Sequence, residues 1–141
     1  MTDWVVDSSI AVKWFVEEEH TEEALRIFDD LLSGAKILWA PDLLISEFTN
    51  VMWKRVLAGD IDEAFAVQSV RDLLQIDLKI VESRELVSSA LELAVQFRRT
   101  VYDSLYLALS LRLECPIITA DRRLYKAVHP EFPGIRWVGA L

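Results

Sequence analysis

Short apolar runs alternate along this chain with longer segments whose apolar residues recur at helical spacing. The longer segments predict helices near residues 8–19, 21–32, 42–57, 60–74, 84–97, 103–113 and 122–128. The runs predict strands at residues 3–7, 36–41, 76–81, 115–121 and 135–141. Strands that alternate with helices form parallel sheets covered on both faces, so we expect an α/β protein. The predicted architecture is a three-layer α/β/α sandwich with a mostly parallel central sheet.

The length and composition favour one globular domain, spanning residues 1–141. The chain has 141 residues, of which 52% are hydrophobic and 27% charged, and this suits a single well-filled core. Its apolar stretches end well before the roughly 18 residues of a membrane span, and the N-terminus lacks the features of a signal peptide. Cys115 is the only cysteine, so an intrachain disulfide or a cysteine-based zinc site is impossible. We therefore expect a cytoplasmic protein.

The net charge of −8 is unevenly distributed along the chain. Residues 1–50 contain eleven acidic and three basic residues, which accounts for the whole net charge, whereas residues 51–141 contain twelve of each sign. A protein this acidic does not attract nucleic acid through a general positive field. If the chain binds a polyanion, local basic clusters or bound cations must make the contact.

Two predicted strands end on an aspartate. Asp7 closes the run WVVD and Asp121 closes IITAD, and in parallel α/β sheets functional groups gather at the carboxyl ends of the strands. Each aspartate also precedes a predicted helix, so N-capping alone could explain either of them. We expect Ser8 or Ser9 to cap the helix after Asp7, which leaves Asp7 available to bind a metal ion.

Two further acids lie on predicted helices. Glu47 forms one stripe with Asn50 and Lys54 on the helix of residues 42–57. An ordinary solvent-exposed face explains such a stripe, although a helix that covers a sheet has little solvent face. Asp103 begins the very apolar segment DSLYLALSLRL, where the helix dipole alone would favour a carboxylate.

The four acids can converge at one edge of a parallel sheet. Clustered carboxylates repel one another, and a divalent cation compensates their charge. Oxygen ligands without histidine or cysteine nearby indicate Mg²⁺ or Mn²⁺ rather than zinc. Such an ion binds phosphate oxygens and activates a water molecule for attack. The sequence therefore predicts a metal site made by Asp7, Glu47, Asp103 and Asp121.

The ordered set of motifs VVDSS, SEFTNVMWK, VYDSLYLALS and IITADRRL resembles the PIN-domain family, and within it the small VapC-type toxins of type II toxin–antitoxin systems. Each motif is weak alone, but their order, their spacing and the chain length match together over essentially the whole chain. The resemblance implies a PIN-like fold and a metal-dependent endoribonuclease. Its catalytic acids would be Asp7, Glu47, Asp103 and Asp121, which would hold one or two Mg²⁺ or Mn²⁺ ions against the scissile phosphate.

The resemblance also implies groups around the acids. Thr119 matches a family hydroxyl that forms a hydrogen bond in the site, and Ser8 and Asn50 are candidates to orient the carboxylates. Some family members carry a further acid shortly after the fourth, where this chain has Arg122 and Arg123. Whether a second metal ion binds is therefore an open question.

Basic residues close in sequence to the acids are candidates for contacts with RNA phosphates. They are Lys13, Arg98, Arg99, Arg122 and Arg123. Paired arginines are also common at solvated helix ends, and we favour this alternative for at least one pair.

The resemblance implies an RNA substrate, a cognate antitoxin and a homodimer. Two other classes of function compete with the toxin. One is a PIN fold that acts in RNA maturation, or that binds metal or RNA without cleavage. The other is a receiver-like phosphoacceptor domain, which requires an acidic pair after the first strand and a lysine after the last parallel strand. The chain has DSS and TAD at these places.

Overall fold

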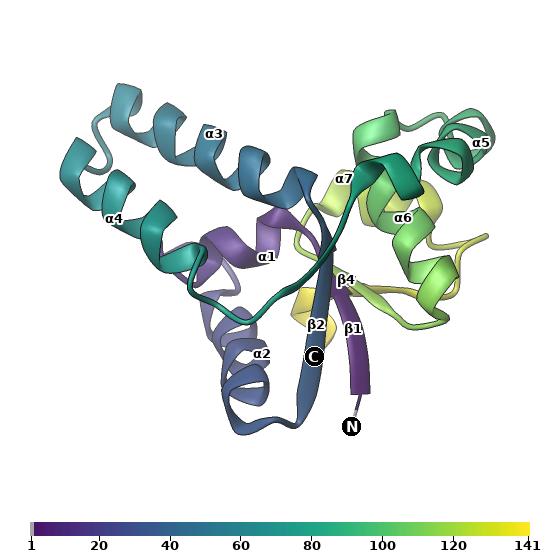
Figure 1. Cartoon of the computed structure of the whole chain (residues 1–141), viewed down its shortest axis with the longest axis horizontal. Coiled ribbons are helices and arrows are strands. Elements are labelled where there is room, and N and C mark those ends of the chain that lie inside the picture. The colour runs from purple at the N-terminus through teal and green to yellow at the C-terminus, as the bar shows by residue number, and fades with distance from the viewer. Residues whose placement is uncertain (1) are drawn as a thin grey trace.

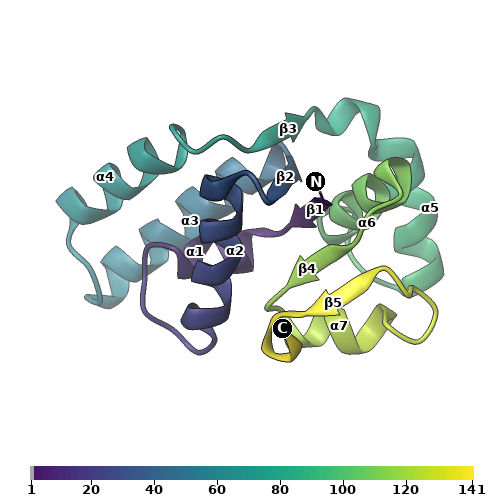
Figure 2. The same cartoon turned by 90° about the horizontal axis from the view of Figure 1, so that it is seen from below.

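A parallel sheet of five strands forms the centre of the molecule (Figures 1 and 2). The structure is a computed structural model that describes residues 2–141. The strands are β1 (Thr2–Val6), β2 (Lys36–Pro41), β3 (Lys79–Val81), β4 (Ile117–Thr119) and β5 (Ile135–Trp137). They follow the order β3-β2-β1-β4-β5 across the sheet, and all four neighbouring pairs are parallel. The prediction of a mostly parallel sheet is confirmed.

Between residues 2 and 141, seven α-helices cover the two faces of the sheet. In both views α1 (Ser8–Lys13), α2 (Thr21–Ser33), α3 (Leu43–Ala58) and α4 (Glu63–Leu73) lie on one side of the strands. The helices α5 (Val87–Phe97), α6 (Val101–Leu113) and α7 (Arg122–Val128) lie on the other side. Short 3-10 turns occur at Ser83–Glu85 and Val138–Ala140. The predicted three-layer α/β/α sandwich is confirmed.

The central strands are buried on both faces, as their continuous apolar runs predict. The strand residues with no exposed surface include Val5, Val6, Leu38, Ile117 and Ile118. Helix α6 packs against β1 and β2, and every residue from 104 to 110 is buried. Burial on all sides explains why this helix has no distinct polar face. None of the helices within residues 2–141 is long and apolar enough to cross a membrane.

The first helix is shorter than the sequence predicts. It ends at Lys13 instead of near Glu19, and the tryptophan that follows packs against α2. Trp14 Nε1 donates a hydrogen bond to the carbonyl of Ala24 at 2.9 Å, and its ring centre lies 5.2 Å from that of Phe28. These contacts belong to the tertiary structure, so helical periodicity does not reveal them.

The prediction that Ser8 or Ser9 caps α1 is wrong. Asp7 is itself the N-cap, because its Oδ1 accepts a hydrogen bond from the Ser9 backbone N–H at 3.1 Å. The Ser9 hydroxyl donates to the same carboxylate and accepts from the Ala120 backbone N–H at 2.9 Å. Ser9 therefore ties the start of α1 to the loop that follows β4.

Candidate active site

The carboxyl edge of the sheet brings the two strand-end aspartates together. Strands β1 and β4 are neighbours, with Val6 paired to Ile118, so Asp7 and Asp121 leave the sheet at the same edge. Asp121 caps α7, since its Oδ1 accepts from the Leu124 backbone N–H at 3.1 Å. Both aspartates therefore have a structural role as helix caps, whatever else they bind.

Asp7 is the most deeply buried of the four acids, with 5% of its surface exposed. The hydroxyl of Thr119 donates to Asp7 Oδ2, and the hydroxyl of Ser9 donates to Oδ1. Burial raises the pKa of Asp7 from 3.8 to about 6, although both hydrogen bonds oppose the rise. The nearby charge of Asp121 adds to it. In the absence of a cation, Asp7 is thus costly to keep ionised.

Glu47 projects from α3, and its Oε1 accepts two hydrogen bonds. Tyr106 Oη donates at 2.5 Å and Ser8 Oγ donates at 3.3 Å. Burial raises the pKa of Glu47, these hydrogen bonds lower it, and the charges of Asp103 and Asp121 raise it further. Burial and the adjacent carboxylate also raise the pKa of Tyr106, so its hydroxyl remains a hydrogen-bond donor.

Asp103 lies in the first turn of α6, a helix whose N-cap is Thr100. Burial raises the pKa of Asp103, the ion pair with Arg99 Nη2 at 3.1 Å lowers it, and the charge of Asp121 raises it. Asp121 therefore acts electrostatically on each of the other three acids. We call these four side chains the carboxylate cluster; they lie where α1, α3, α6 and α7 converge at one edge of the sheet (Figure 1).

The donors of the carboxylate cluster suit a hard divalent cation. Within residues 2–141, no hydrogen bond involves Glu47 Oε2, Asp103 Oδ1 or Asp121 Oδ2, so three acids each keep one oxygen free. Yet no group of three or more Asp, Glu, His or Cys side chains in this part of the chain lies close enough to hold one ion. In this arrangement at most two of these side chains could bind the same ion, and water molecules would complete its coordination.

Two residues selected from the sequence form no hydrogen bond with the carboxylate cluster. Asn50 is exposed on α3, and its side chain forms no hydrogen bond within residues 2–141. Lys13 is 9% exposed, and its ammonium group pairs with Glu18 at 3.1 Å. Their proposed roles in the site stay predictions.

The four arginines selected from the sequence have different surroundings. Arg99 pairs with Asp103, and Arg98 takes a left-handed backbone conformation at the C-cap of α5. Arg122 and Arg123 are exposed on α7. Contacts of these arginines with RNA phosphates also stay predictions.

Sequence reasoning missed the hydroxyl of Tyr106. It contacts Glu47 across 59 positions of the chain, and such a pairing depends on how α3 and α6 pack together. A weak signal existed, because Tyr106 follows Asp103 by three positions and therefore lies on the same helix face. Ser9 was considered only as a cap, although its hydroxyl contacts Asp7.

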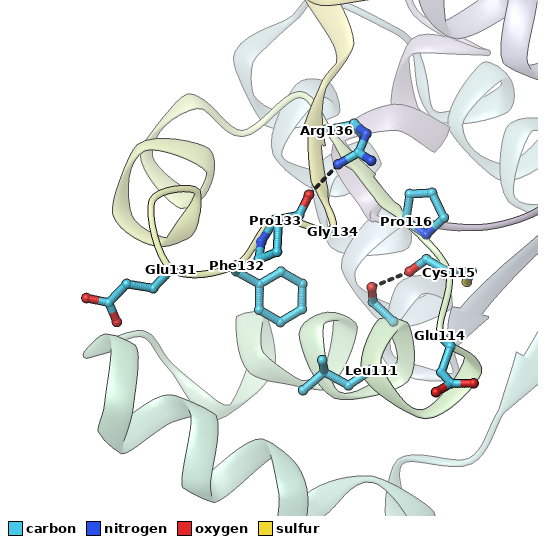
Figure 3. A pocket seen from close by; sticks show the side chains of 10 residues that line it. Leu111, Glu114, Cys115, Pro116, Glu131, Phe132, Pro133, Gly134 and Arg136 are labelled. Atoms are coloured by element: carbon cyan, nitrogen blue, oxygen red, sulfur yellow. Dashed lines mark hydrogen bonds between the residues drawn. The ribbon is translucent and has the colours of Figure 1, made fainter.

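A hollow of about 550 Å³ lies at the opposite edge of the sheet (Figure 3). Its lining includes Cys115 and Pro116, which precede β4, whereas Asp121 follows that strand. Figure 3 shows the carboxylates of Glu114 and Glu131 on two sides of it. None of the four acids lines this hollow, so it is separate from the carboxylate cluster.

The sequence of the chain matches the PIN domain family over residues 4–129, a span that contains all four acids. Ribonuclease VapC3 from Pyrobaculum aerophilum is 33% identical over 122 residues, which cover 85% of this chain and 90% of that protein. The match therefore extends over nearly the full length of both proteins.

Solved structures share the fold. The crystal structure of PAE2754 from Pyrobaculum aerophilum has a TM-score of 0.72 at 23% identity and covers 99% of this chain and 85% of that one. VapC20 from Mycobacterium tuberculosis, described as a sarcin-ricin loop cleaving toxin, has a TM-score of 0.66 at 14% identity, covering 89% and 95%. A toxin–antitoxin complex from Klebsiella pneumoniae has a TM-score of 0.59 at 13% identity, covering 94% of each chain. The family match and the 33% identical relative show that the chain, whose fold these structures share, belongs to the PIN-domain family, among proteins of the VapC type.

Proposed function

We propose that this protein is a divalent-metal-dependent endoribonuclease that acts as the toxin of a toxin–antitoxin pair. The carboxylate cluster carries the proposal, because its mutually repelling charges stand at the carboxyl edge of a parallel sheet. The name of the relative Ribonuclease VapC3 supports ribonuclease activity. The structural neighbours described as a sarcin-ricin loop cleaving toxin and as a toxin–antitoxin complex support the role as a toxin.

The acids Asp7, Glu47, Asp103 and Asp121 would hold one or two Mg²⁺ or Mn²⁺ ions. A bound ion would stabilise negative charge on the phosphate and the leaving oxygen, and would make a water molecule a stronger nucleophile. No residue of the chain needs to form a covalent bond with the substrate, because water is the attacking group.

The contribution of the chain is to position these carboxylates. Ser9 and Thr119 hold both oxygens of Asp7, so this acid would offer its remaining lone pairs in a constant orientation. Tyr106 and Ser8 hold one oxygen of Glu47 and leave the other free. Hydrogen bonds of this kind orient the ligands of a metal ion and increase the affinity of the site for the ion.

A protein partner and a second copy of the chain complete the proposal. Four large apolar side chains on or between α3 and α4 are exposed, at 56%, 68%, 44% and 44% of their surface: Trp53, Leu57, Phe65 and Val67. Exposed apolar groups that gather on one pair of helices favour contact with another protein. We expect an antitoxin to bind this protein and the toxin alone to be a homodimer. Light scattering on the protein, alone and with the product of the adjacent reading frame, measures both.

One observation favours a second candidate, a PIN fold that binds RNA without cutting it. No three acidic side chains within residues 2–141 lie close enough to hold an ion. Membership of the PIN-domain family argues against the receiver-like alternative.

The decisive experiment compares the wild type with Asp7→Asn on total cellular RNA in Mn²⁺, in Mg²⁺ and in EDTA. Circular dichroism of both proteins reports folding, and Asp29→Asn, at an exposed position of α2, is the matched control. We expect metal-dependent cleavage by the wild type and the control, and none by a folded Asp7→Asn. A folded wild type, freed of antitoxin, that cuts no RNA under any of these conditions would support the binding protein instead.

A further inference from the structure

A hollow between α7 and β5 differs in composition from the rest of the surface. It has a volume of about 340 Å³, within the range of about 300–1,000 Å³ that is typical of small-ligand sites. Three side chains of α7, its C-cap residue and one residue at the end of β5 line it: Arg122, Tyr125, Lys126, His129 and Trp137. The helix residues recur at intervals of three and four positions, so they share one face of α7. We call this hollow the α7–β5 pocket.

The α7–β5 pocket is basic in a protein whose net charge is −8. No carboxylate is among its lining residues, whereas four other hollows within residues 2–141 each contain at least one. Within residues 2–141, the one ion pair of a lining residue joins Arg122 Nη2 to Oε1 of Glu19 at 4.0 Å. Both of these side chains are more than half exposed, so their pairing is weak. The pocket thus provides the local basic surface that an acidic protein needs to contact a polyanion.

Three aromatic rings lie together in the pocket, and the ring of Trp137 is tilted by 45° from that of Tyr125. The rings of Tyr125 and His129 are parallel to within 7°, with centres 4.8 Å apart. The ring of Trp137 lies 6.0 Å from that of Tyr125, and the guanidinium carbon of Arg122 lies 5.1 Å from the centre of the tryptophan ring. Aromatic faces beside basic side chains are the means by which proteins bind single-stranded nucleic acid, since bases stack on the rings and phosphates pair with the cations.

The pocket adjoins the carboxylate cluster. Strands β4 and β5 pair Thr119 with Trp137, and Thr119 donates a hydrogen bond to Asp7. Asp121 is the N-cap of α7, the helix that carries three of the other lining residues and ends at the fourth, its C-cap His129. Figure 2 shows α7 and β5 side by side. A strand of RNA whose phosphate lay at the acids would therefore pass close to the pocket.

We propose that the α7–β5 pocket binds one nucleotide of unpaired RNA next to the bond that is cut. The base stacks on Trp137, and its phosphate pairs with Arg122 and Lys126. The substrate class is single-stranded RNA, because a base inside a duplex has no free face to stack. This inference rests on the proposed ribonuclease function and extends it to the choice of substrate.

The first test removes the stacking platform. Binding of a fluorescent ten-nucleotide single-stranded RNA is measured by anisotropy in EDTA, so that no turnover occurs. Trp137→Leu should weaken binding by about 5- to 100-fold, the effect of losing one base–aromatic stack. Trp137→Phe keeps an aromatic face and should retain most of the affinity. Affinity for a duplex of the same sequence should be lower and insensitive to both substitutions.

The second test removes the charges. For the double variant Arg122→Gln/Lys126→Gln, the slope of log affinity against log salt should flatten by about 1.4, since each phosphate contact to a single strand contributes about 0.7. The control Arg71→Gln/Lys79→Gln removes the same charge at exposed positions of α4 and β3, far from α7 in Figure 2. This control should keep the slope of the wild type.

Parallel cleavage assays with total RNA separate this inference from the proposed function. If the wild type cuts RNA while the folded pocket variants bind the single strand as the wild type does, the pocket inference is overturned and the proposed function stands. An equal loss in the charge control overturns it as well. If the wild type neither binds nor cuts RNA, both proposals fall. If the variants lose affinity for an acidic decapeptide and keep their affinity for RNA, the pocket is a protein-binding site instead.

Discussion

The two acids at strand ends and the two acids on helices are held by different means. Asp7 and Asp121 accept hydrogen bonds from backbone N–H groups of the helices that they begin, so their positions follow the backbone. Glu47 and Asp103 are held only by side chains of other residues. The backbone thus fixes the positions of the strand-end pair, whereas the side chains of the helix pair can rotate while the backbone stays in place.

The largest effect is expected from removing a charge of the helix pair. Glu47→Gln keeps the size of the side chain and its ability to accept from Tyr106, but it loses the negative charge that a cation requires. Metal-dependent cleavage should fall by about 10³-fold or more, because the affected step depends on the bound ion. Initial rates of RNA cleavage over a range of Mn²⁺ concentrations measure it.

The control for this variant is Glu92→Gln, at an exposed position of α5, which should cut as the wild type does. A rate within a few-fold of the wild type for Glu47→Gln at all Mn²⁺ concentrations would remove Glu47 from the site. The two pairs would then no longer be comparable, and only the strand-end pair would remain a complete pair of candidate ligands.

The second prediction concerns how far the ionised, buried carboxylate of Asp7 lowers the free energy of unfolding of the metal-free protein. Burial raises the pKa of Asp7 from 3.8 to about 6 in the folded protein, so the folded state binds the proton more tightly than the unfolded state. The ionised group therefore destabilises the fold above pH 6, and this cost disappears as the pH falls toward 4. The ionised carboxylate lowers the free energy of unfolding by about 3 kcal/mol in total.

Urea denaturation in EDTA tests this cost with Asp7→Asn, which has no such titration. The free energy of unfolding of the variant, relative to the wild type, should rise by about 3 kcal/mol from about pH 4 to pH 7.5. Mn²⁺ should reverse the order at the higher pH, because it stabilises only the wild type. A difference that does not change with pH would mean that Asp7 titrates normally in the folded protein.

The third prediction concerns a variant that loses a hydrogen-bond donor to Glu47 and keeps all four acids. Tyr106→Phe deletes the hydroxyl that donates to Glu47. Loss of a group that orients a metal ligand costs about 10- to 100-fold in affinity for the ion or in activity. The Mn²⁺ concentration for half-maximal cleavage measures this effect. Tyr102→Phe, on the same helix at a position that is 62% exposed, should behave as the wild type; identical behaviour of the two variants would show that Glu47 needs no such partner.

The smallest expected change in stability separates the two roles of Asp121. Asparagine is as good an N-cap as aspartate, so Asp121→Asn should keep the stability of the protein, whereas Asp121→Ala should lose about 1 kcal/mol. Both should lose cleavage. Asp62→Ala removes the cap of α4, and it should lose similar stability while cleavage is retained. If Asp121→Asn cuts RNA as well as the wild type, Asp121 serves the fold alone.

Much of the fold could be predicted because its signals are local. The strand at residues 36–41 has the predicted limits, and the helix predicted for residues 42–57 spans Leu43–Ala58. The four acids were also selected by local position, either at the end of a strand or within a helix. Two predictions were wrong around α1: the helix ends at Lys13, where Trp14 packs against α2, and Asp7 rather than a serine is its cap.

The hydrophobic periodicity and the aspartates that follow apolar runs were enough to determine the α/β class and the edge where the acids meet. Hydrophobic periodicity depends on neighbours within a few positions, so the sequence contains it directly. Only the tertiary structure decided which distant groups hold Asp7 and Glu47. Thr119 reaches Asp7 across 112 positions and Tyr106 reaches Glu47 across 59. Contacts over such distances depend on strand order and helix packing, which no short pattern specifies.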